Sequence, residues 1–201
     1  MSWIKIIPYT ASTGTLRRIY DRVKGPDDYI DNILQVHSLR PHTLQGHMTL
    51  YKNVLHHTGN TLPKWLLETL GVYVSLLNGC AYCVEHHFEG LRGLLQDEAR
   101  TSAIREALET STFDGVFDER EQAVLRYAGH LTRVPTEVDL AHIAAMREAG
   151  LDDGEILEVN QVVSYFAYAN RTVLGLGVST EGDILGLSPG DSDHPDNWHH
   201  R

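Results

Sequence analysis

The stretch Asn78-Gly79-Cys80-Ala81-Tyr82-Cys83-Val84-Glu85-His86-His87 holds the only two cysteines among the 201 residues of the chain. The cysteines form a C-x-x-C pair, and His87 follows the second by four residues. On a helix, positions i, i+3 and i+7 share one face, so the two thiols and the imidazole are predicted to lie together. The stretch therefore indicates a compact redox or metal-binding unit.

The segment before this motif contributes one carboxylate. Glu68 is the only charged residue in the otherwise apolar stretch 65–74. An isolated buried charge is costly, so Glu68 is expected to be exposed, paired or functional. The connection at residues 77–79 is short, which predicts two antiparallel helices as neighbours. Glu68 and His87 are then expected to meet across the hairpin.

Hydrophobic periodicity predicts an all-α fold built on antiparallel helical hairpins. Asn78 is predicted to be an N-cap, Gly150 to follow a helix end, and Asp152 or Asp153 to cap the last long helix. The predicted helices cover residues 12–24, 42–57, 64–77, 80–95, 97–108, 118–131, 135–149 and 155–174. Only residues 3–7 look strand-like, and that segment is too short to define a sheet.

The predicted cap gives the thiols a chemical context. With Asn78 as N-cap, Cys80 lies in the first turn, where free N–H groups and the helix dipole favour a thiolate. A thiolate attacks the O–O bond of a peroxide and becomes a sulfenic acid, which a second thiol converts to a disulfide. His87 is one turn beyond Cys83 and is suited to relay the proton.

Composition excludes several classes of function. The net charge of −10 and the pI of about 5.6 argue against a nucleic-acid partner. No apolar run reaches the roughly 20 residues that cross a membrane, and the N-terminus lacks the features of a secretory signal. Two cysteines in one tight motif are typical of a working thiol pair in a reducing compartment, so a cytoplasmic location is expected.

The spacing Glu-x11-Cys-x2-Cys-x3-His, carried by Glu68, Cys80, Cys83 and His87, resembles the alkylhydroperoxidase D-like (AhpD-like) branch of the carboxymuconolactone decarboxylase superfamily. The resemblance implies that Cys83 is the peroxidatic thiol, that Cys80 resolves it, and that Glu68 and His87 form a proton relay. It implies a thiol-dependent peroxidase that reduces a small hydroperoxide and is regenerated by a dithiol reductant.

Residues 162–171 (VVSYFAYANR) and 174–178 (LGLGV) resemble the peroxidase-related subgroup of that superfamily. With the helix entry at Arg40-Pro41-His42, the resemblance covers about residues 35–180. It implies an all-helical fold and a symmetric homo-oligomer, a trimer or a hexamer. The best-studied relatives carry another histidine immediately before the second cysteine, and Tyr82 takes that place here.

Other readings of the motif remain open. The same residues suit a redox-sensing or zinc-binding module with negligible turnover, with Cys80, Cys83, Glu68 and either His86 or His87 as the zinc ligands. A c-type haem is disfavoured because Val84 stands where its histidine is required, and a thioredoxin fold is disfavoured because no βαβ context is present. The peroxidase reading requires no cofactor and no metal.

The remaining polar residues are given simpler interpretations. His86 is expected to be an exposed neighbour, and Asn170 with Arg171 to form a helix-end or interface pairing. His42, His47, His56 and His57 are interpreted as polar positions on one helix. The chain is predicted to form a single domain over residues 1–190, followed by a loosely ordered tail at 191–201.

Overall fold

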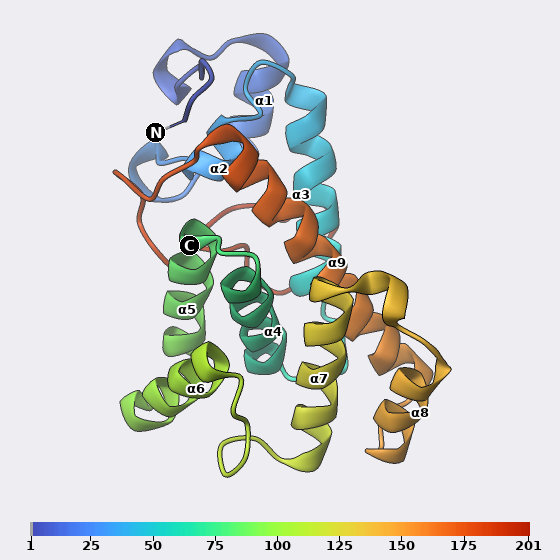
Figure 1. The fold of residues 1–201 in the computed structure, drawn as a ribbon. Helices are drawn as coiled ribbons and strands as arrows, with labels where there is room; N and C mark the ends of the chain where they lie inside the picture. The colour runs from blue at the N-terminus through green and yellow to red at the C-terminus, as the bar shows by residue number, and fades with distance from the viewer. Residues whose placement is uncertain (1) are drawn as a thin grey trace.

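The protein is described here by a computed structural model that covers residues 2–201, and within them it contains no strand. Nine α-helices follow one another along these residues (Figure 1). Their bounds are α1 Gly14–Val23, α2 Asn32–Gln35, α3 Pro41–Leu55, α4 Lys64–Leu77, α5 Ala81–Leu95, α6 Glu98–Thr110, α7 Glu119–Arg133, α8 Leu140–Glu148 and α9 Asp153–Leu176. Three short 3-10 turns lie at Tyr9–Ala11 (η1), Pro26–Asp28 (η2) and Pro135–Glu137 (η3). The predicted all-α class is confirmed.

Helix α4 is the centre of the molecule. It packs against α5, α9, α7 and α6, and every residue from Leu66 to Ser75 is buried. Figure 1 shows α4 and α5 as adjacent helices, with the long α9 running past them. Because α4 is enclosed on all sides, its apolar composition reflects complete burial rather than an amphipathic face. Glu68 is thus carried into the interior by the helix that contributes most to the core.

The predicted helices agree with the structure except near two boundaries, and the short helix α2 was not predicted. The helix predicted at 64–77 has the observed bounds, and Asp118 and Asp152 cap α7 and α9 with capping boxes. The single helix predicted at 135–149 is instead the turn η3 followed by α8. Asp139 causes this break, because its side chain caps α8 and its backbone N–H contacts His142.

The second boundary lies between α4 and α5, where the predicted N-cap at Asn78 is wrong. Gly79 has φ +68°, its N–H donates to Leu76 O at 3.1 Å, and the Cys80 N–H donates to Ser75 O at 2.9 Å. These two bonds form a Schellman motif that ends α4. Asn78 is therefore the C-cap of α4, and Cys80 is the N-cap of α5.

The C-terminal segment returns to the body of the protein. Residues 191–201 were expected to be loosely ordered, yet Trp198 and His200 are only 2% and 3% exposed. Trp198 lies under the Arg22 guanidinium, 3.7 Å from its ring centre, and His200 Nδ1 donates to Val23 O at 2.7 Å. Two aromatic side chains thus anchor a segment whose other residues are mostly exposed. Within residues 2–201 no helix has the length and apolar character needed to cross a bilayer.

Candidate active site

The two thiols lie together at the start of α5. Their Sγ atoms are 3.0 Å apart, both cysteines are free, and Cys80 and Cys83 are 0% and 3% exposed. The turn explains this geometry, because an N-cap side chain points toward the side chain three residues later in the first turn. The predicted pairing of Cys80 with Cys83 in space is therefore present, in the reduced form.

The two thiols differ in acidity. The pKa of Cys80 is lowered, mainly because the Cys83 thiol can donate a hydrogen bond to its thiolate and also because the Cys83 backbone amide lies close. The pKa of Cys83 is raised by the neighbouring Cys80 sulfur and by burial. Cys80 is thus the more acidic thiol, although the family resemblance implies that Cys83 is the attacking one. Because the sulfurs share one proton, the first deprotonation belongs to the pair rather than to one residue.

Asn170 is a site residue that the sequence interpretation missed. It is 0% exposed on α9, accepts from the Asn78 side chain at 2.9 Å and donates to Ser75 Oγ at 3.0 Å. Its amide also lowers the pKa of both cysteines. The signal that could have identified Asn170 is an asparagine within the apolar stretch of a long helix, because a buried amide needs hydrogen-bond partners. Asn170 links α9 to the turn that carries the thiols.

Glu68 and His87 meet across the α4–α5 hairpin as the spacing predicts. His87 Nδ1 lies 2.7 Å from Glu68 Oε2, and the two side chains are 16% and 5% exposed, in the order His87 and Glu68. The His87 ring contacts Phe166 edge to face, with ring centres 4.6 Å apart. The carboxylate fixes the ring orientation and makes Nδ1 the donor, which leaves Nε2 to exchange a proton.

The charge of Glu68 is retained although the residue is buried. Burial acts to raise the pKa of Glu68, but the charge and hydrogen bond of His87 and the Lys64 charge outweigh it, so the pKa is lowered. Lys64 begins α4, one turn before Glu68. Glu68 is consequently an anionic partner for His87 at neutral pH.

Cys83 and the Glu68–His87 pair line one small, partly open cavity. Its volume is about 50 Å³, room for about three or four water molecules. Cys80 lines a separate pocket, whereas Cys83 lines this cavity together with both members of the Glu68–His87 pair. Its other lining residues are Asp31, Ile33, Leu34, His47, Tyr51, Tyr82, His86, Gly90, Tyr165, Ala169, Gly186, Leu187, Ser188 and His200.

The four predicted site residues form two pairs and not one cluster. Across residues 2–201, no hydrogen bond joins either thiol to Glu68 or His87. The zinc site predicted as an alternative, with both cysteines, Glu68 and a histidine, is not assembled either, because in this part of the chain only Asp31, His86 and Asp183 bring three ligand atoms together. A molecule in the cavity is what would connect Cys83 to His87.

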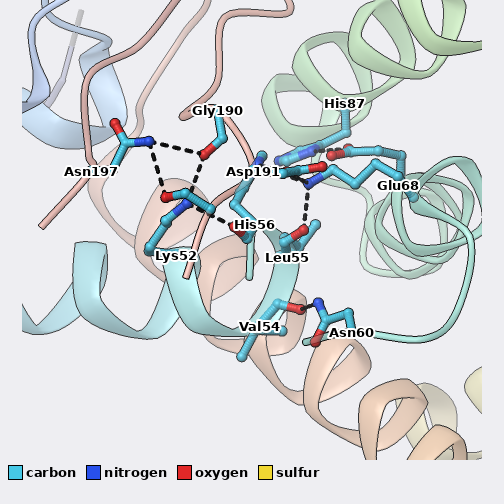
Figure 2. Close-up of polar contacts among 12 residues, drawn as sticks. Lys52, Val54, Leu55, His56, Asn60, Glu68, His87, Gly190, Asp191 and Asn197 are labelled. Atoms are coloured by element: carbon cyan, nitrogen blue, oxygen red, sulfur yellow. Dashed lines mark hydrogen bonds and ion pairs between the residues drawn. The ribbon is translucent and has the colours of Figure 1, made fainter. Parts of the chain in front are cut away.

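The chain after α9 lines this cavity through residues 186–188 and His200, and the residues between them are attached to the body of the protein. Lys52 is 0% exposed and donates to His56 O and Gly190 O, at 2.7 Å each. Figure 2 shows how this side chain lies between the two acceptors. Asp191 lies 3.0 Å from Lys64 Nζ, and Lys64 Nζ is 2.8 Å from His56 Nδ1. Because burial lowers the pKa of His56, its Nδ1 is suited to accept from Lys64. Two lysines thus attach the segment to α3 and α4.

Two of the histidines interpreted as polar positions on one helix are buried. His47 and His56 are 3% and 1% exposed, whereas His42 is exposed and His57 partly so. The His47 ring lies 5.9 Å from that of Tyr165 and 5.2 Å from that of His37. The side chain of His86, expected to be an exposed neighbour, is 10% exposed and faces the cavity. Aromatic packing around the cavity accounts for this burial.

Tyr82 does not take part in the thiol site. Its hydroxyl donates to Asp183 Oδ2 at 2.6 Å and accepts from the Ile33 N–H at 3.1 Å. His86 Nε2 lies 3.1 Å from the same carboxylate oxygen. The residue that replaces the expected histidine therefore binds a carboxylate from the segment after α9.

Comparison with solved structures identifies proteins that have the same fold. An uncharacterized peroxidase-related protein from Silicibacter sp. TM1040 is 24% identical, with 73% of this chain and 74% of that chain covered and a TM-score of 0.66. A protein from Ralstonia eutropha JMP134, described as an alkylhydroperoxidase AhpD core and an uncharacterized peroxidase-related protein, is 20% identical, with coverage of 89% and 91% and a TM-score of 0.74.

The debrominase Bmp8, solved in complex with 2,3,4-tribromopyrrole, is 15% identical, with 82% of each chain covered and a TM-score of 0.64. No protein-family profile matches the chain, and no curated protein matches it in sequence. The chain has the helical fold of the AhpD-like peroxidase-related proteins, and the fold implied by the sequence resemblance is confirmed.

Proposed function

We propose that the protein is a thiol-dependent peroxidase in which Cys83 attacks a small hydroperoxide. The observation that carries the proposal is the shared cavity: Cys83 faces it from one side, and the hydrogen-bonded Glu68–His87 pair faces it from another. A hydroperoxide group is small enough for about 50 Å³. A second thiol at 3.0 Å from the first supplies the resolving group.

The first step transfers one oxygen atom to sulfur. The Cys83 thiolate attacks the distal oxygen of R–O–O–H, the O–O bond breaks, and Cys83 becomes a sulfenic acid. The leaving alkoxide takes a proton from His87 and departs as the alcohol, or as water when R is hydrogen. Glu68 stabilises the imidazolium before that transfer. Because burial and Cys80 raise the pKa of Cys83, proton removal by the relay is required for this thiol to react.

The second step forms the disulfide. The Cys80 sulfur attacks the Cys83 sulfenic acid, which releases water and joins the sulfurs at about 2.05 Å. The 3.0 Å separation means that closure needs a shift of about one ångström. An external dithiol then reduces the disulfide by exchange and is itself oxidised, which restores both thiols.

The test is the consumption of hydrogen peroxide and of a small organic hydroperoxide by the full chain with a dithiol donor. We expect multiple turnovers in wild type, loss to background in Cys83→Ser, and a single oxidation event per chain in Cys80→Ser. Consumption by Cys83→Ser at the wild-type rate would refute the assignment of the attacking thiol. Mass spectrometry of the oxidised protein identifies the sulfenic acid or disulfide directly.

A redox sensor with negligible turnover is the second candidate. The observation that favours it is enclosure, because Cys83 is 3% exposed beneath the C-terminal segment. A sensor would form the Cys80–Cys83 disulfide once per oxidant pulse and would not be reduced rapidly by a dithiol. Steady-state turnover above about 1 s⁻¹, within the usual range of enzymes, selects the peroxidase.

A bromopyrrole substrate suits this chain less well. The ring and its bromines need far more room than about 50 Å³, and organic-ligand pockets usually enclose roughly 300–1,000 Å³. We therefore expect no bromide release from 2,3,4-tribromopyrrole under conditions that support peroxide reduction, and measurement of free bromide checks this.

The assembly and location that the resemblance implies belong to this proposal. A trimer or hexamer is expected, and light scattering on the eluting protein measures the mass directly. Exposed apolar side chains such as Leu140 and Leu157, 73% and 59% exposed, are the surfaces that such an assembly would cover. A cytoplasmic location agrees with two free thiols and is checked by fractionation of the producing cell.

A further inference from the structure

A second cluster of titratable side chains lies at a different part of the cavity wall from Glu68, where Asp31 and His86 line it. Asp31 precedes α2, His86 lies on α5, and Asp183 follows α9. One ligand atom from each residue lies within 4.8 Å of the other two. The side chains are 6%, 10% and 1% exposed, respectively. None of the four residues assigned to peroxide chemistry belongs to this cluster.

The cluster contains an unpartnered carboxylate oxygen. Asp31 Oδ1 is buried and makes no hydrogen bond with any residue of the described range 2–201. Asp31 Oδ2 is 3.8 Å from His200 Nδ1, but that nitrogen already lies 2.7 Å from Val23 O. Buried carboxylate oxygens are almost always satisfied, and leaving one without a donor is costly. Asp31 lines the cavity, so the free oxygen is available to a ligand there.

The net negative charge of the cluster also favours binding of a cation. Two carboxylates face each other with one imidazole between them, and no lysine or arginine side chain forms an ion pair with either acid within residues 2–201. Two buried anions at this separation repel each other. A bound divalent ion would balance both carboxylates at once.

Asp183 is oriented as metal ligands commonly are. Its Oδ2 accepts from Tyr82 Oη at 2.6 Å, and its carboxylate accepts from the Asn32 N–H at 3.2 and 3.3 Å. Hydrogen bonds of this kind hold a ligating carboxylate in place and tune its affinity for the ion. Tyr82 thereby has a role, which its position in the C-x-x-C motif did not suggest.

We propose that Asp31, His86 and Asp183 bind one divalent transition-metal ion, with Zn²⁺ or Mn²⁺ as the chemistry that fits. Two carboxylates and a neutral imidazole form a mixed oxygen and nitrogen donor set that suits these ions better than Mg²⁺ or Ca²⁺. Metal–ligand bonds of about 2.0–2.2 Å place ligand atoms roughly 3–4 Å apart. The observed limit of 4.8 Å needs only small side-chain rotations. With three protein ligands, a coordination position stays open toward the cavity.

The test uses the full chain, freed of metal with a chelator and titrated with Zn²⁺ by calorimetry. We expect one site per chain in wild type and in the double variant Cys80→Ser/Cys83→Ser. Affinity should fall by at least about 100-fold in Asp31→Asn and in Asp183→Asn, because a ligand is lost. Asp139→Asn is the matched control, since Asp139 pairs with His142 at 2.8 Å on the surface without a third ligand.

The absence of stoichiometric Zn²⁺ binding in wild type would overturn the proposal. Loss of binding in the double cysteine variant would assign the ion to the thiols and overturn it too, as would full binding in both aspartate variants. Because Asp183→Asn also loosens the chain after α9, a second measurement on wild type is decisive. The Co²⁺-substituted protein should show d–d absorption without the thiolate-to-cobalt charge-transfer band that cysteine ligation produces.

Discussion

The two walls of the cavity are built in different ways. The wall with the thiols and the Glu68–His87 pair is one helical hairpin, and its paired residues are 19 positions apart in sequence. The facing wall joins the segment around Asp31 to the chain after α9, whose contacting residues are 151 positions apart. Helix packing holds the first wall, whereas individual polar bonds hold much of the second. The hairpin is therefore expected to position the residues that react with the hydroperoxide. The facing wall is expected to control substrate access and ligand binding.

The largest expected effect concerns the relay on the hairpin wall. In Glu68→Gln the Nδ1 proton of His87 loses its anionic partner, so the imidazolium is no longer stabilised. We expect kcat/KM for a small hydroperoxide to fall about 100-fold, the lower end of what general acid–base groups contribute. The measurement is stopped-flow peroxide consumption across pH.

Glu85→Gln is the control for that variant. Glu85 is on the same helix as His87 with a side chain that is 48% exposed, and its contact is Arg105 at 3.6 Å. Its rate should equal that of wild type. An unchanged rate in Glu68→Gln would remove the carboxylate from the relay and leave His87 to act alone.

The next effect tests how rigidly helix packing defines the hairpin wall. A Cβ at Gly71 would lie 2.1 Å from the Phe166 ring, and Phe166 is 0% exposed and packs against His87. Gly71→Ala must therefore displace the ring and with it the imidazole. We expect a loss of about 2–3 kcal/mol in the free energy of unfolding, measured by urea denaturation, together with reduced activity.

Gly93→Ala provides the comparison on α5. A Cβ added at Gly93 would have no neighbouring atom within 4 Å, and this residue is exposed. Alanine should stabilise this helix by up to about 1 kcal/mol. If both glycine variants behaved alike, close packing at Gly71 would not be the factor that positions His87.

The same contrast explains how far the sequence could be interpreted. The bounds of α4 followed from its apolar run and from Pro63, and the Glu68–His87 contact followed from helical spacing. Asn78 was misassigned because a good N-cap residue and a C-cap position look alike until the φ of Gly79 is known. The hydrogen bond from Cys80 N–H to Ser75 O makes Asn78 a C-cap instead of an N-cap. The amino-acid composition of this stretch does not predict that bond.

The facing wall could not be derived from the sequence. Asp31 and Asp183 each stand in polar, turn-forming surroundings, and nothing local shows that they converge on His86. The buried Trp198 and His200 lie in a segment rich in Asp, Asn and His, which is typical of a mobile tail. Tertiary contacts between distant segments decide both cases, and single-sequence periodicity contains no information about them.

A smaller effect concerns pH and a histidine between the walls. Burial lowers the pKa of His47 to about 3 from about 6.5. Between these two pH values, His47 therefore binds a proton in the unfolded chain but not in the folded chain. The contribution of neutral His47 to the free energy of unfolding is complete above pH 6.5. It decreases as the pH falls toward 3, by at most about 1.4 kcal/mol per pH unit.

His47→Leu should flatten this part of the stability curve, and urea midpoints from about pH 7 to about pH 4 measure it. His42→Gln, on the exposed side of the same helix, should leave the slope as in wild type. Asp31 acts in the opposite sense, since burial raises its pKa to about 7. The difference between the His47→Leu and wild-type curves isolates His47, and parallel curves would contradict its protected neutral state.

The smallest expected effect concerns access through the facing wall. Asp191→Asn removes the ion pair with Lys64 at 3.0 Å and leaves the Lys52 bond to Gly190 O intact. Because Asp191 is 48% exposed, the loss of stability should stay below about 1 kcal/mol. That amount corresponds to an increase of up to about five-fold in the population of a loosened C-terminal segment.

A looser segment should favour large substrates selectively. We expect the rate with a bulky hydroperoxide to rise by up to about five-fold in Asp191→Asn, while the rate with hydrogen peroxide, which fits about 50 Å³, stays constant. Asp193→Asn, the same substitution two residues away at an exposed position, should alter neither rate. Equal gains for both substrates would mean that the variant changes the thiols themselves. No gain for the bulky substrate would mean that Lys52 and the buried rings of the tail, and not Lys64, keep the cavity closed.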